Sequence, residues 1–196
     1  MQVQEAIGGG SGRQGTVGWV VYRDQMDGSL MEDGFAHHVW ATLRLIDTCL
    51  SLSPEQLQTE VPGTYGSILG TMRHLVEADA WYLFDTSGQG APPADEDDAD
   101  LAALRAVMVA DETAWSLFLA RDLDPNTVVR EVDPTDGFQR DAPIGIRLAQ
   151  ALHHGTDHRS QICIALTMLG VDPPNIDVWD FGVDTGSVVD DHASGA

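Results

Sequence analysis

Two histidines in the last third of the chain have a spacing that favours metal binding. His154 and His158 are four residues apart within a helical pattern of apolar residues. On an α-helix this spacing places both imidazoles on one face, one turn apart. The same face carries Ala151, Ile162 and Ala165, so it is predicted to point into the core. An imidazole away from water needs partners for both ring nitrogens, and a divalent cation is a common partner.

The pair also has a simpler interpretation, because histidines four residues apart arise by chance. One of them would then be a hydrogen-bonded core residue and the other would reach solvent. His74 lies in an earlier helical pattern, between Gly70 and Ala78 one turn away on either side. A lone histidine of this kind is more often a packed or surface residue, but it can supply a third ligand. Three histidines would leave a position open for water or substrate, as in catalytic metal sites.

Four long helices are expected to position these residues. The period of the apolar residues predicts helices near residues 35–51, 66–85, 100–121 and 144–169. Ser53 and Pro54 suit the start of a short turn after the first helix, and Gly170 suits the end of the last. The chain is therefore predicted to form an all-α four-helix bundle, with a metal site between helices two and four.

The two ends of the chain are predicted to lie outside this domain. Residues 8–12 have the composition of a flexible linker, so residues 1–34 are interpreted as a disordered extension. The domain is predicted to span residues 35–182, followed by a disordered tail over residues 183–196. Residues 122–144 are not helical in pattern and predict a loop with a small hairpin.

Composition excludes several classes of partner. The chain has 196 residues, 10 Lys+Arg against 31 Asp+Glu, and a net charge of -21, so we expect no binding to nucleic acid or to an anionic membrane surface. No apolar run is long enough to cross a membrane, and the N-terminus lacks the pattern of a signal peptide. Cys49 and Cys163 lie singly in helical patterns, which favours reduced thiols in a cytoplasmic protein over a disulfide.

Three stretches of the sequence resemble the DinB/YfiT-like family of metalloenzymes, which is distinct from the DNA polymerase that shares the DinB name. The matching residues are Trp40-Ala41 with Arg44-Leu45-Ile46; Ser67-Ile68 with His74-Leu75 and Trp81; and His154-x-x-x-His158-Arg159-x-Gln161-Ile162 with Gly170, Pro173-Pro174 and Asp177-x-Trp179-Asp180. The resemblance covers about residues 35–182. Ser160 stands where the family usually has glycine, a departure that leaves the ligand positions unchanged.

The resemblance implies a four-helix bundle, often dimeric, with His74, His154 and His158 as metal ligands. Zinc is the first expectation, although three imidazoles also suit nickel, iron or copper. The implied activity is transfer of a small thiol of the mycothiol or bacillithiol type to an electrophile, or a related hydrolysis or isomerisation. Glu77 and Asp157 are candidates for acid–base roles, although solvated helix carboxylates are commoner. Arg159 is expected to pair with a carboxylate on helix two or with an anionic substrate.

A second class of function remains open from the sequence, namely a metal-binding stress-response protein without catalytic activity. The two classes predict different surroundings for the histidines. A cleft that opens onto them supports the enzyme, and a closed core with a fourth protein ligand supports the binding protein.

Overall fold

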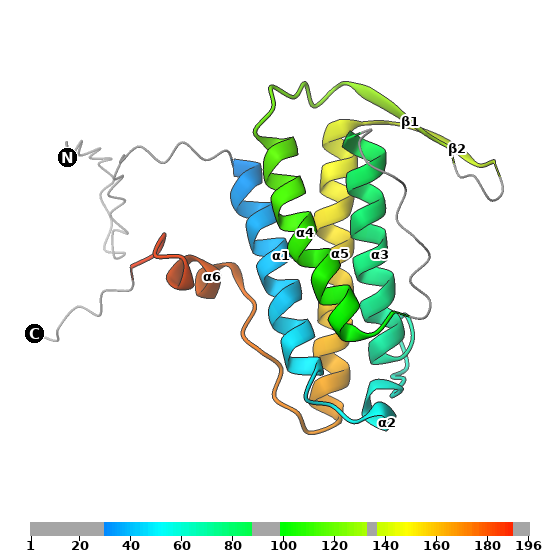
Figure 1. Cartoon of the computed structure of the whole chain (residues 1–196), viewed down its shortest axis with the longest axis vertical. Coiled ribbons are helices and arrows are strands. Elements are labelled where there is room, and N and C mark those ends of the chain that lie inside the picture. Colours follow the sequence, from blue (N-terminus) through cyan, green and yellow to red (C-terminus); the bar gives the residue numbers. More distant parts are fainter. Residues whose placement is uncertain (1–29, 88–98, 133–136, 190–196) are drawn as a thin grey trace, which may run out of the picture.

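Helices make up most of the computed structural model, which describes residues 30–87, 99–132 and 137–189. The described elements are α1 (Leu30–Cys49), α2 (Pro54–Leu57), α3 (Ile68–Ser87), α4 (Leu101–Leu119), β1 (Val128–Val132), β2 (Gln139–Pro143), α5 (Ile144–Met168) and α6 (Val178–Asp184). Figure 1 shows the four long helices, α1, α3, α4 and α5, lying side by side. None of the described helices combines the length and the apolar character that a membrane crossing requires.

One core lies between the four long helices. Helix α1 packs against α4 and α5, and α3 packs against the same two helices. Apolar side chains at helical spacing meet in the middle and are almost fully buried; they include Val39, Ile46, Met72, Met108 and Ile162. This arrangement makes α3 and α5 neighbours along their length, which is the condition for His74 to approach the pair on α5.

The ends of the helices differ in part from those the sequence predicts. Helix α1 begins at Leu30, so residues 30–34, which the sequence assigns to the extension, are helical. Helix α6 continues to Asp184, so the predicted boundary of the tail falls inside a helix. The rest of the predicted extension, residues 1–29, and residues 190–196 of the predicted tail lie outside the described residues.

Local signals at two helix ends behave as predicted. The Ser53 side chain accepts a hydrogen bond from the backbone N–H of Gln56, and Oε1 of Gln56 accepts one from the backbone N–H of Ser53, so α2 begins with a capping box. Helix α5 ends at Met168, and Gly170 follows with a φ of 73°. That left-handed conformation suits glycine because it has no β-carbon.

A small hairpin lies within residues 122–144, where the sequence predicts one, so the fold is mostly helical and not strictly all-α. Strands β1 and β2 pair in antiparallel fashion, with Val128 opposite Pro143 and Val132 opposite Gln139. The hairpin extends over the end of the helices where α5 begins (Figure 1). The buried Arg147 of α5 donates hydrogen bonds to the carbonyl oxygens of Val129 and Arg140, which fasten both strands to the helix.

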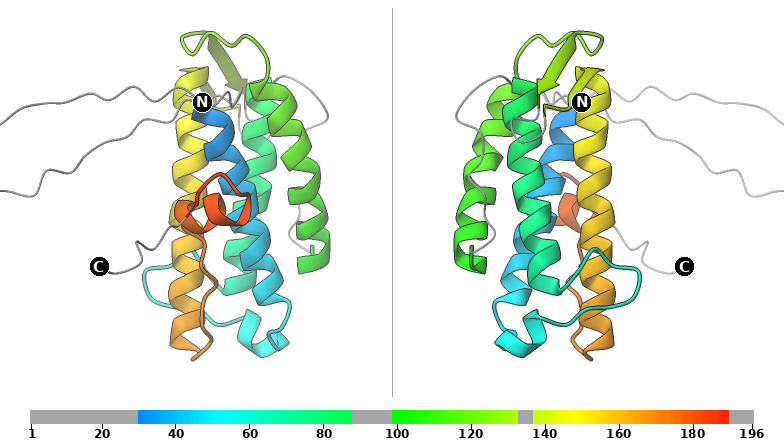
Figure 2. Two further views of the ribbon diagram at one scale, coloured as in Figure 1. Left: turned by 90° about the vertical axis from the view of Figure 1, so that its left-hand side faces the viewer. Right: turned by 90° about the vertical axis from the view of Figure 1, so that its right-hand side faces the viewer.

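Helix α6 lies across the outer side of α1 (Figure 2). The ring of Phe181 packs edge-on against Trp40 and His37. His37 also hydrogen-bonds through Nε2 to the carbonyl oxygen of Ile176, and Arg44 forms an exposed ion pair with Asp184. These contacts hold the C-terminal segment on a face of α1.

Candidate metal centre

His74 of α3 and His154 and His158 of α5 converge, and one ring nitrogen from each lies within 4.8 Å of the others. The Nε2 atoms of His74 and His154 are 3.1 Å apart. His74 and His154 are half-buried, and His158 is 8% exposed. The residues that the sequence predicts as a group therefore do form a cluster, at the interface between α3 and α5.

The size of this cluster fits one small divalent cation. Two imidazole nitrogens bound to the same zinc-sized ion lie at most about 4.2 Å apart, since each bond is about 2.1 Å. The 3.1 Å separation of His74 and His154 satisfies this limit, and the 4.8 Å bound on the cluster requires at most a small rotation of one ring. Neutral imidazole nitrogens suit zinc and its neighbours in the first transition series.

The orientation of His158 is set by Gln161, one turn further along α5. Oε1 of Gln161 accepts a hydrogen bond from the backbone N–H of Tyr65 at 3.1 Å, which identifies it as an acceptor. Nδ1 of His158 lies 3.0 Å from the same oxygen and therefore donates its proton there. Nε2 of His158 then carries the lone pair and is free to act as a ligand, as in other histidines held by an outer hydrogen bond.

Two tyrosines enclose the cluster. The ring of Tyr65 stacks on His74 with centroids 3.9 Å apart and planes 9° apart. Tyr82 of α3 presents its ring to His154 at a centroid distance of 5.5 Å and an angle of 81°. The tyrosines restrict rotation of the imidazoles and keep part of each ring away from water.

This environment disfavours protonation of the histidines. Burial lowers the pKa of His154 to about 4, with further lowering by His158 and His74. Burial also lowers the pKa of His74, and the nearby His158 adds to the effect. A deprotonated imidazole is the form that binds a metal, so the lowered pKa values keep two nitrogens available at neutral pH.

A second polar group, centred on His38 of α1, lies behind the cluster and is almost fully buried. Nε2 of His38 donates to Oδ1 of Asp79 at 2.8 Å, and Nδ1 accepts from Nη1 of Arg159 at 3.0 Å. The other carboxylate oxygen of Asp79 accepts from Nε1 of Trp115 at 3.0 Å. Arg159 also donates to Thr42. This His38 network links α1, α3, α4 and α5 beside the ligand-bearing helix.

Gly155 allows α5 to pass over His38. A β-carbon at position 155 would lie 2.3 Å from Cε1 and 2.6 Å from Nδ1 of His38, which is closer than atoms can approach. The glycine between the two α5 ligands is thus required by the close packing of α5 on α1. Its role could not be read from the His-His spacing alone.

The other candidates from the sequence do not join the cluster. Asp157 is exposed, and Glu77 is half-buried outside the cluster of possible ligands. His153, next to His154 in the sequence, is exposed as well. From the sequence, Arg159 is expected to pair with a carboxylate of helix two or with an anionic substrate. Its guanidinium hydrogen-bonds to His38, Thr42 and Thr156, and it is linked to the Asp79 carboxylate of α3 through His38. Burial lowers the pKa of Arg159 to about 10, partly offset by the charge of Asp79.

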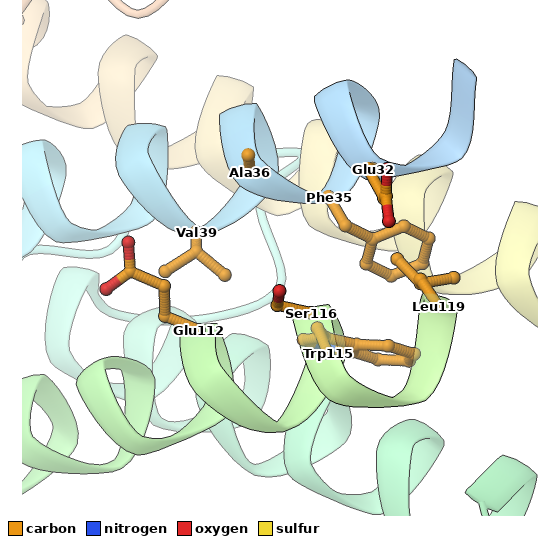
Figure 3. Close-up of a pocket in the computed structure, with 8 residues that line it drawn as sticks. All are labelled: Glu32, Phe35, Ala36, Val39, Glu112, Trp115, Ser116 and Leu119. Atoms are coloured by element: carbon orange, nitrogen blue, oxygen red, sulfur yellow. The ribbon is translucent and has the colours of Figure 1, made fainter. Parts of the chain in front are cut away.

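Two hollows adjoin the packed helices. One, of about 320 Å³, lies between α3, the hairpin and the start of α5, and Tyr82 and Gln150 are among the residues that line it. The other, of about 230 Å³, lies between α1 and α4. Figure 3 shows the rings of Phe35 and Trp115 in this second hollow, with the carboxylates of Glu32 and Glu112 near opposite ends. Tyr82 contacts His154, so the first hollow adjoins the histidine cluster.

The fold and the site together define a mostly helical protein with a candidate three-histidine metal centre. Residues 26–184 match the model of the DinB family, and the chain belongs to that family. The crystal structure of a DinB-like protein from Bacillus cereus ATCC 10987 has the same fold, with a TM-score of 0.57 and 18% sequence identity. That match covers 74% of this chain and 94% of the other. No match was found among curated proteins.

Proposed function

We propose that the chain forms a four-helix bundle that holds a divalent metal ion at His74, His154 and His158 and uses it in catalysis. The proposed reaction is transfer of a low-molecular-weight thiol, of the mycothiol type, to an electrophile; a related hydrolysis or isomerisation is the alternative. The observation that carries the proposal is the convergence of three ring nitrogens within 4.8 Å. Zinc is the first choice for the ion because three imidazoles and an open position suit it.

The absence of a fourth candidate ligand favours catalysis over simple storage. Within the described part of the chain, no further histidine, cysteine, aspartate or glutamate joins the three histidines. A cation with an open position lowers the pKa of a thiol or water that enters it, and so supplies a nucleophile at neutral pH. The hollow next to Tyr82 offers space for a second reactant beside the cluster.

The residues around the cluster would keep it in one geometry throughout turnover. Gln161 holds the Nδ1 proton of His158, so that His158 presents Nε2 inwards. Stacked Tyr65 fixes the plane of His74. Because ligand rings locked by outer contacts need not reorganise during the reaction, these contacts are expected to favour both affinity and rate.

An activity screen of the zinc-loaded protein tests this function. Low-molecular-weight thiols are supplied with a panel of electrophiles, and loss of free thiol is measured for the parent, His154→Ala and His153→Ala. We expect turnover by the parent and His153→Ala, and none by His154→Ala. A protein that binds zinc but consumes no thiol, ester or isomerisable substrate would instead support a metal-binding stress-response protein.

We also propose a homodimer in the cytoplasm. Ile164 and Met168 lie one turn apart on α5 and are 52% and 66% exposed, which supports self-association through this helix. The two cysteines of the described chain are free thiols, which suits a reducing compartment. Sedimentation of the full-length protein tests the dimer, and a monomer at all concentrations would contradict it.

A further inference from the structure

We propose that the hollow beside Tyr82 binds the carboxylate group of a small organic acid. This acid would be the second reactant of the reaction proposed above, so its role as a reactant rests on that proposed function. The proposal comes from the hydrogen-bonding capacity that the residues around this hollow leave unused. The binding step itself requires no metal, so it can be tested separately.

The hollow shares a wall with the histidine cluster. Gln150 lies one helical turn before His154 on α5, and its Nε2 lies 3.3 Å from the hydroxyl of Tyr82. The ring of Tyr82 in turn contacts His154. The volume of about 320 Å³ is at the small end of the range for ligand pockets, so it fits a small molecule.

Arg147, which lines the hollow, has a donor that no described group satisfies. Its side chain is 6% exposed, and Nη1 pairs with Asp85 and Glu131. Nη2 is taken by two hairpin carbonyl oxygens, whereas Nε is buried without a hydrogen-bond partner. A buried N–H without an acceptor costs free energy, and a ligand oxygen that displaced the atoms covering Nε would recover it.

Arg140 of β2 supplies a second guanidinium. It is 57% exposed, lies over the ring of Phe138, and reaches Glu131 at 3.6 Å. Glu131 is already engaged by Nε1 of Trp81 at 3.4 Å and by Arg147. Among the described residues, the long contact to Glu131 is the ion pair of Arg140, so its guanidinium can bind another anion.

Among the described residues around the hollow, the hydrogen-bonding groups that remain available are thus mostly donors. The hydroxyl of Tyr82 accepts from Gln150 and keeps its own proton to donate, which adds to the donors of Arg140 and Arg147. The acceptor oxygens of Glu131 are occupied. A carboxylate matches this arrangement, because its oxygens accept several charge-assisted hydrogen bonds and pair with an arginine fork.

The distribution of basic residues supports an anion at this end of the molecule. The chain has ten basic residues, all arginine, within a net charge of -21. Arg130 and Arg140 lie on the hairpin, and Arg147 lies at the start of α5. Asp141 and Asp85 neutralise Arg130 and Arg147, whereas the contact of Arg140 with Glu131 is long. Arg140 is therefore the arginine of this group that is best placed to attract an anionic ligand to an acidic protein.

The separation of the two sites limits the size of the ligand. Four residues of α-helix rise about 6 Å, which is the interval between Gln150 and His154 on α5. A carboxylate beside Gln150 in the hollow would therefore lie about one helical turn from His154. The expected ligand is a short carboxylic acid with its reactive carbon near the acid group.

Binding of succinate and of its neutral analogue succinamide tests the proposal. Affinity is measured by NMR titration of the full-length protein, as purified and after chelation of metal, for the parent, Arg140→Gln, Tyr82→Phe and the control Arg130→Gln. Arg130 is a matched control because it lies on the same hairpin, is 61% exposed and pairs with Asp141. We expect succinate to bind at least about tenfold more tightly than succinamide, and Arg140→Gln to remove most of that preference. Tyr82→Phe should weaken succinate severalfold, and Arg130→Gln should not.

Each alternative result has a defined meaning. Equal binding of the two probes, no binding of succinate, or an unchanged affinity in Arg140→Gln would overturn the carboxylate site. Succinate binding that disappears on chelation would place the carboxylate on the metal and would also overturn it. Binding that depends on Arg140 in a protein unable to hold metal would support the site while contradicting the proposed catalytic function.

Discussion

The histidine cluster and the His38 network differ in how completely their ring nitrogens are satisfied. Both nitrogens of His38 have protein partners, Asp79 and Arg159, and the ring is 1% exposed. In the cluster, Gln161 occupies one nitrogen of His158, while the Nε2 atoms of His74 and His154 face each other. A histidine with two protein partners is a structural residue, whereas two imidazole nitrogens 3.1 Å apart can share either a proton or a metal ion. The surroundings, more than the residue type, separate the two roles.

The largest effect is expected when the His38 network is broken. His38→Ala leaves the buried Asp79 carboxylate and the Arg159 guanidinium without their shared partner, so the free energy of unfolding should fall by about 3–5 kcal/mol. Urea denaturation of the chelated protein measures it, with exposed His153→Ala as the control. A loss below about 1 kcal/mol would show that the network does not stabilise the fold.

A pH-dependent weakness is expected at Asp111, next to this network. Burial raises the pKa of Asp111 to about 7, and the charge of Asp79 adds to the effect. The folded state holds the proton more tightly than the unfolded state, so the stabilisation is complete below about pH 4 and is lost as the pH rises through 7. The upper limit of this loss is about 4 kcal/mol.

Asp111→Asn removes that titration. Relative to the parent, the variant should gain stability between pH 5 and pH 8, as measured by urea denaturation of chelated protein at both values. A parent–variant difference that does not change with pH would contradict the raised pKa. Both proteins share all other titrating groups, so the difference isolates Asp111.

Removal of a cluster histidine should lower zinc affinity and leave the stability of the metal-free protein nearly unchanged. His154→Ala leaves two ligands, and zinc affinity should fall by about 100-fold or more, since even loss of an outer partner costs about 10–100-fold. Stability of the chelated protein should change little, in contrast to His38→Ala. Zinc titration with a competing chelator measures the affinity. A variant that keeps the parent affinity would exclude His154 as a ligand.

A smaller effect is expected at Gly155. In Gly155→Ala the new β-carbon would overlap the His38 ring, so α5 and α1 must separate slightly, at a cost of about 1–3 kcal/mol. Ser160→Ala, at an exposed position of the same helix, is the control and should stay within about 0.5 kcal/mol. Stability unchanged in Gly155→Ala would mean that the two helices are not packed as described.

The parts of the structure that depend on local spacing were predictable from the sequence. The apolar period predicts the four long helices, and the four-residue interval predicts that His154 and His158 share a face. His74 could not be assigned as a ligand from local spacing alone, because a single histidine between small residues has no distinguishing pattern. The resemblance to a known family supplied that assignment, and the packing of α3 on α5 brings His74 to the pair.

The parts that depend on contacts across the fold were not predictable. His38 meets Asp79 and Arg159 at sequence separations of 41 and 121 residues, and no local pattern marks such a network. Gln161 did belong to the recognised motif, so its contact with His158 could have been proposed from the three-residue helical interval. Tyr65 lies in a loop, so the direction of its ring could not be predicted from a helical or strand period.

Anomalous X-ray scattering shows most directly whether His74, His154 and His158 hold one metal ion. Crystals of the zinc-loaded protein are measured above and below the zinc edge. We expect one strong anomalous peak with a nitrogen of each of the three histidines about 2.0–2.1 Å away. A peak at other residues, or no peak at this cluster under zinc saturation, would contradict it.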